Sequence, residues 1–84
     1  MKKIFSTQDV SMMNEITNFI GKSPDIICDE MIVWYLNDEE GCVEFNLEKK
    51  EIGFIDAIID TKTYFAIVGL SASWGYTTED YFRA

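Results

Sequence analysis

The chain has 84 residues, a length that suits one domain with one hydrophobic core. Hydrophobic residues make up 48% of the sequence and aromatic residues 14%, a composition that argues against intrinsic disorder. Fifteen acidic and seven basic residues give a formal net charge of −8, which disfavours direct binding to nucleic acid or anionic membranes and favours a basic partner.

The composition also excludes several kinds of site. The chain has no histidine, so it lacks an imidazole base and any histidine-based triad or metal site. Its two cysteines, Cys28 and Cys42, match no zinc or redox spacing and are too few for a disulfide framework. There is no glycine-rich phosphate loop, and we expect neither a signal peptide nor a membrane span. We therefore expect a cytoplasmic protein that needs no metal or cofactor and is not an enzyme.

The first expected element is a helix over Thr7–Ile20. Ser6 suits the N-cap position, and Asp9 complements the exposed amides of the first turn. The residues that form an apolar stripe at helical spacing are Val10, Met13, Ile16, Thr17 and Ile20, with Met12 and Phe19 on its flanks. Gly21 followed by Pro24 predicts the end of this helix.

After the helix the pattern changes to strands joined by short turns, which predicts an antiparallel meander. The expected strands are Met31–Leu36, Cys42–Glu48, Glu51–Asp60 and Tyr64–Leu70, with turns at 37–41, 49–50 and 61–62. The tail, 71–84, is expected to add an edge strand through Trp74 and Tyr76, then a helical turn capped by Thr77 or Thr78. The sequence thus predicts a single α+β domain over residues 1–84, with an N-terminal helix packed on one face of a four- to five-stranded antiparallel meander.

The turn lengths set which strand residues share a face. They place Trp34 opposite Phe45, and Phe45 opposite Phe54. The helix is expected to cover the face that holds Ile32, Trp34, Leu36, Val43, Phe45, Leu47, Ile52, Phe54, Ile58, Phe65 and Ile67. Asp56 falls on this face too. A bulge that turns it outward, or the end of the helix cover, explains such a carboxylate better than a functional role does.

The opposite face mixes acids with more apolar residues than a monomer usually exposes. Its expected members are Met31, Val33, Tyr35, Glu44, Asn46, Glu48, Ile55, Ala57, Ile59, Tyr64, Ala66, Val68 and Leu70. Three alternatives could cover this face: the C-terminal tail with its aromatic residues, a second copy of the chain, or a partner protein.

Aromatic residues beside acids are typical of protein–protein interfaces. The candidate partner-binding residues are Tyr35, Asp38, Glu39, Glu40, Glu44, Glu48, Tyr64, Val68, Trp74 and Tyr76. Our leading hypothesis is a small acidic inhibitor that occupies the basic surface of a nucleic-acid-handling enzyme such as a nuclease. Phage anti-defence proteins, anti-nuclease proteins and toxin immunity proteins belong to this class. The alternatives are an assembly module that homodimerises through the second face, and a plain domain whose acidity serves solubility.

Overall fold

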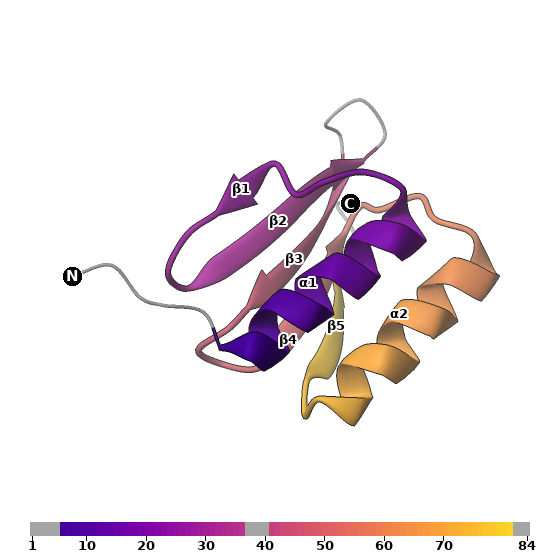
Figure 1. The fold of residues 1–84 in the computed structure, drawn as a ribbon. Coiled ribbons are helices and arrows are strands. Elements are labelled where there is room, and N and C mark those ends of the chain that lie inside the picture. The colour runs from indigo at the N-terminus through magenta and orange to yellow at the C-terminus, as the bar shows by residue number, and fades with distance from the viewer. Residues whose placement is uncertain (1–5, 37–40, 82–84) are drawn as a thin grey trace.

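The computed structural model describes residues 6–36 and 41–81 of the chain. Within these residues, two helices and five strands form a two-layer α+β fold (Figure 1). The elements are α1 (Thr7–Ile20), β1 (Ile26–Ile27), β2 (Met31–Leu36), β3 (Gly41–Asn46), β4 (Glu51–Ile55), α2 (Thr61–Ser73) and β5 (Thr77–Tyr81). The expected α+β class, with an N-terminal helix on a largely antiparallel sheet, is confirmed.

The order of the strands in the sheet follows the chain, β1-β2-β3-β4-β5. Strands β1 to β4 pair antiparallel, whereas β5 pairs parallel to β4. A parallel pair needs a long crossover, and α2 supplies it. Both helices therefore lie side by side on the same face of the sheet (Figure 1). Neither helix of the described chain has the length and apolar character needed to cross a membrane.

Helix α1 has the predicted bounds and caps. The Ser6 side chain accepts a hydrogen bond from the Asp9 amide at 3.1 Å, and the Asp9 carboxylate accepts one from the Ser6 amide at 3.2 Å. Gly21 ends the helix in the left-handed conformation, with φ of 88°. The predicted stripe is partly wrong, because Val10 is 41% exposed while Met12, expected on a flank, is buried.

The pairing of β2, β3 and β4 differs from the expected register by two residues. Trp34 lies opposite Val43, and Phe45 lies opposite Ile52. The turn after β3 has four residues, 47–50, and the Asn46 side chain stabilises it by accepting hydrogen bonds from the Glu48 amide at 3.1 Å and the Lys49 amide at 2.9 Å. A shift of two keeps every side chain on its face. The predicted core positions Ile32, Trp34, Val43, Phe45, Leu47, Ile52 and Phe54 are accordingly buried.

The predicted strand over Tyr64–Leu70 is wrong, because these residues belong to helix α2. Asp60 caps this helix: its carboxylate accepts hydrogen bonds from the Thr63 amide at 3.0 Å and the Thr63 hydroxyl at 2.7 Å. The predicted turn at 61–62 is therefore the first turn of a helix. Two residues expected on the covered face, Ile58 and Phe65, are instead 79% and 63% exposed.

The predicted third strand is too long, since β4 ends at Ile55. The next residue, Asp56, takes a positive φ of 48°, which aspartate tolerates better than most residues and which turns the chain out of the strand. Gly41 allows this turn, because a Cβ atom there would overlap the Asp56 carbonyl group. Asp56 is half-buried just beyond the strand, so the end of the regular sheet explains its place.

The tail also differs from the expected arrangement. The edge strand begins at Thr77 rather than running through Trp74 and Tyr76. The helical turn expected to begin at Thr77 or Thr78 is absent from the described tail, since both residues belong to β5. Trp74 is the C-cap of α2, and Tyr76 is 4% exposed. The Tyr76 ring packs edge-on against Phe45, with ring centroids 5.3 Å apart.

Candidate protein-binding face

One face of the sheet has no helix of the described chain on it (Figure 1). Strand alternation and the pairing registers assign to this open face the residues Ile26, Met31, Val33, Tyr35, Cys42, Glu44, Asn46, Glu51, Gly53, Ile55, Thr77 and Glu79. In β3, buried residues that face the helices alternate strictly with half-buried residues of the open face, so the same strand builds both the core and this surface.

Three glutamates surround a glycine at the centre of the open face. Glu44 lies opposite Gly53, which in turn lies opposite Glu79 on β5. Two strand spacings therefore separate the Cα atoms of Glu44 and Glu79, a distance of about 10 Å. Gly53 has no side chain and leaves a hollow of about 320 Å³. The hollow is lined by Glu44, Asn46, Lys49, Glu51, Gly53, Ile55 and Glu79.

The electrostatic field at the hollow is negative. Three carboxylates line it against one ammonium group, that of Lys49. Within residues 6–36 and 41–81, Glu44, Glu51 and Glu79 have no ion-pair partner. The strands fix the backbone positions of these three glutamates. A cationic group that binds here therefore loses little free energy to ordering the protein.

An apolar row runs beside these glutamates. Tyr35, Cys42 and Ile55 lie opposite one another on β2, β3 and β4, and all three are half-buried. Val33, in the next row, is only 4% exposed between its cross-strand neighbours. The open face thus combines an aromatic and aliphatic strip with an acidic one, as protein interfaces often do.

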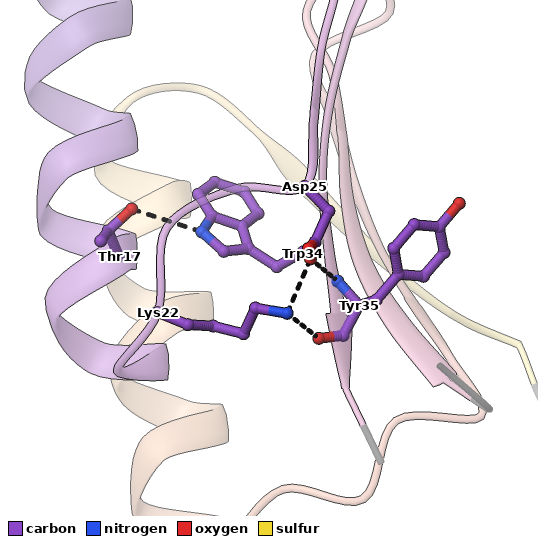
Figure 2. A network of polar contacts seen from close by, with 5 residues as sticks. All are labelled: Thr17, Lys22, Asp25, Trp34 and Tyr35. Carbon is purple, nitrogen blue, oxygen red and sulfur yellow. Dashed lines mark hydrogen bonds and ion pairs between the residues drawn. The ribbon is translucent and has the colours of Figure 1, made fainter. Parts of the chain in front are cut away.

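A polar network holds Tyr35 in place at the edge of β2 (Figure 2). The Asp25 carboxylate accepts a hydrogen bond from the Tyr35 amide at 2.8 Å, and Lys22 Nζ donates one to the Tyr35 carbonyl at 2.9 Å. Lys22 and Asp25 also form an ion pair at 2.8 Å. The hydrogen bond from Lys22, followed by that from the Tyr35 backbone, holds the pKa of Asp25 below its ordinary value.

The residue before Tyr35 is anchored on the other side of the sheet. The indole N–H of Trp34 donates to the Thr17 hydroxyl at 3.3 Å, which joins β2 to α1. Figure 2 shows the Trp34 ring directed toward α1 and the Tyr35 ring directed away from it. The backbone between the two rings is therefore held from both sides, and Tyr35 is presented on the open face.

The structure brings together only part of the expected binding set. Tyr35 and Glu44 lie on the open face, and Glu48 is exposed in the turn between β3 and β4. Asp38, Glu39 and Glu40 lie outside the described residues.

The other four expected binding residues lie on the helix side. Tyr64 and Val68 belong to α2 and pack against the core, with the Tyr64 ring 4.7 Å from that of Phe54. Trp74 also packs against the core. The apolar half-face expected from a strand at 64–70 is therefore wrong, and Trp74 and Tyr76 do not cover the open face.

Tyr76 is a core residue whose hydroxyl has no hydrogen-bond partner among the described residues. Burial, and then the nearby charge of Asp9, raises the pKa of Tyr76 to about 12. This side chain therefore stays protonated and contributes apolar packing to the core.

Glu51, Gly53 and Glu79 are open-face residues that were not among the expected set. A glycine inside an apolar strand pattern, such as Gly53, is a sequence signal for a bulge or for the close approach of a ligand or another backbone. Glu79 carries no such signal, because its place depends on the parallel pairing of β5 with β4.

The described chain contains no group of three or more cysteine or acidic side chains placed to hold a metal ion. Comparison with protein-family models, curated proteins and solved structures finds no match to this chain.

Proposed function

We propose that the protein is a small acidic binding protein whose open sheet face docks on the basic surface of a partner protein. The observation that carries this proposal is the placement of Glu44, Glu51 and Glu79 around the hollow at Gly53, beside the apolar row of Tyr35 and Ile55. Carboxylates without ion-pair partners favour a basic surface, and the adjoining apolar row adds contact area that excludes water.

We propose further that the partner is a nucleic-acid-handling enzyme such as a nuclease. Such enzymes carry concentrated lysine and arginine residues where they bind phosphates. Carboxylates spaced along a sheet would occupy those side chains and displace the nucleic acid by competition. A phage anti-defence protein, an anti-nuclease protein or a toxin immunity protein would act in this way.

A homodimer through the open face is less favoured by the same geometry. It would bring the glutamates of two chains together, each chain with a net charge of −8. Like charges across an interface oppose association. Val68, which was expected on this second face, lies on helix α2 instead.

The proposal is tested by capture of proteins from a cell lysate on the immobilised protein, with two charge-matched variants. Glu44→Gln/Glu79→Gln changes the open face, whereas Glu15→Gln/Glu30→Gln removes the same charge from exposed positions on α1 and in the β1–β2 turn. We expect the open-face variant to bind the captured enzyme about tenfold more weakly and the control variant to bind as the wild type does.

A second measurement on the captured enzyme concerns its nucleic-acid site. Added DNA or RNA duplex should elute the enzyme, and the bound protein should inhibit it, because both ligands would use one basic surface. Retention of the enzyme by the open-face variant at wild-type strength, or binding that nucleic acid does not affect, would show that the proposal is wrong.

A further inference from the structure

The two edges of the sheet differ in how their backbone groups are used. At one edge of the sheet, β1 has only two residues and pairs with only part of β2. Other groups of the chain bind the backbone of β2 beyond the end of β1. The Asp25 amide donates to the Val33 carbonyl at 2.8 Å, and the Asp25 carboxylate and Lys22 ammonium bind the amide and carbonyl of Tyr35 (Figure 2). Groups of Lys22 and Asp25 thus occupy the positions that an added strand would need along the part of β2 that β1 does not cover.

Within the described residues, no side chain covers the β5 edge in this way. β5 is the last strand of the sheet and spans five residues. The Thr77 amide donates at 3.0 Å to the carbonyl of Lys50, the residue that directly precedes β4. In a parallel ladder the bonded residues alternate, so Thr77 and Glu79 bind β4 while the backbone groups of Thr78 and Asp80 face outward. Within the described chain, Thr78 makes no hydrogen bond on this outer side.

The charge at this edge distinguishes between possible occupants. Glu79 is exposed on β5, and it also lines the hollow beside Gly53. A second copy paired through β5 would bring two Glu79 residues close together in a complex of two strongly acidic chains, an arrangement that opposes pairing. A strand with basic side chains would instead meet complementary charge.

We infer that β5 receives an extended, lysine- or arginine-rich segment of the partner protein as an additional strand of the sheet. The inference deepens the proposed function, on which it rests for the charge of the partner. Main-chain hydrogen bonds to Thr78 and Asp80 supply affinity in this mode of recognition, and alternate side chains supply specificity. Basic side chains on the open-face side of the added strand would lie next to Glu79 and the hollow.

The probe is a short synthetic peptide of alternating lysine and valine residues, compared with one of alternating glutamate and valine, in amide NMR titrations of the whole chain. We expect the lysine peptide to shift the Thr78 and Asp80 amides and to protect them from hydrogen exchange. Thr78→Pro, which removes an outward amide without removing a ladder bond, should weaken binding about tenfold. Ile27→Pro, a proline at the opposite edge, should leave binding unchanged.

Other variants keep the inference testable and separate it from the proposed function. If Thr78→Pro does not fold, Glu79→Lys serves instead, and it should reverse the preference toward the glutamate peptide. Wild-type binding by Thr78→Pro together with weakened binding by Glu44→Gln would overturn the added strand and leave the proposed function standing. Equal binding of both peptides at Thr78 would overturn the basic character of the segment. Self-association in sedimentation that Thr78→Pro abolishes would identify a second copy as the occupant and overturn the inference.

Discussion

Asp25 illustrates how one side chain can replace part of a strand. Its carboxylate accepts a hydrogen bond from the Tyr35 amide, while Lys22 binds the carbonyl of the same residue. These groups lie beyond the two residues of β1, where β2 would otherwise be an unprotected edge. The network therefore protects this edge and also fixes the position from which Tyr35 enters the open face.

At the residue scale, we expect Asp25→Asn to lower the free energy of unfolding at neutral pH. The pKa of Asp25 is lowered in the folded protein from its ordinary 3.8, first by the hydrogen bond from Lys22. The ionised group therefore stabilises the fold at pH values above its unfolded pKa, and this contribution is lost as the pH falls through the folded pKa. Urea unfolding of both proteins at neutral pH and well below pH 3.8 tests this. A difference in stability that persists unchanged in acid would contradict it.

At the element scale, the strands were easier to predict than the second helix. In β3 a strict alternation of apolar and polar residues identified the core positions, although the pairing register was two residues off. The error in register was harmless because a shift of two leaves the faces unchanged. The same alternation of side chains between the two faces of a strand placed Tyr35 and Glu44 correctly on the open face.

Helix α2 was missed because its sequence suits either structure. The run from Tyr64 to Leu70 is rich in aromatic and apolar residues, and a short buried helix cannot be distinguished from a buried strand by such a run alone. Gly69, the next-to-last residue of the run, also disfavours a helix by about 1 kcal/mol. The distinguishing signal was Asp60, whose side chain caps the helix. Without α2, neither the crossover to β5 nor the place of Glu79 was predictable.

The cap of α2 gives a prediction for this element. Asp60→Ala should lower the urea midpoint of unfolding, because the Thr63 amide and hydroxyl lose their acceptor. Asp60→Asn should retain most of the stability, since asparagine is as good an N-cap residue as aspartate. Urea unfolding followed by circular dichroism compares the three proteins. Equal midpoints for the alanine variant and the wild type would show that the cap does not stabilise the helix.

At the scale of the whole molecule, charge and layers combine to give two unlike sides. Helices α1 and α2 cover one face of the sheet (Figure 1). The other face carries glutamates without ion-pair partners in the described chain. With fifteen acidic and seven basic residues, repulsion between carboxylates opposes the compact state. The protein therefore keeps an acidic surface at some cost to its own stability.

This balance predicts that sodium chloride stabilises the fold. Raising the ionic strength from about 0.01 M to about 1 M shortens the Debye length from about 30 Å to about 3 Å and screens the repulsion. The free energy of unfolding in urea should increase over this range, and the increase should be smaller for Glu44→Gln/Glu79→Gln. Chloride is preferred to sulfate, since sulfate stabilises proteins by exclusion from their surface. A fall in stability with added salt would contradict the prediction.

The alternation along β3 also bears on how such a protein can change over generations. Val43 and Phe45 maintain the fold, while Glu44, between them, faces outward. Mutations at the outward positions leave the packing against the helices intact, so under the proposed function selection could alter the binding specificity with little loss of stability. If the target of the proposed inhibitor changes, this separation of core and surface positions would be an advantage, because new surface residues can be selected without changing the core.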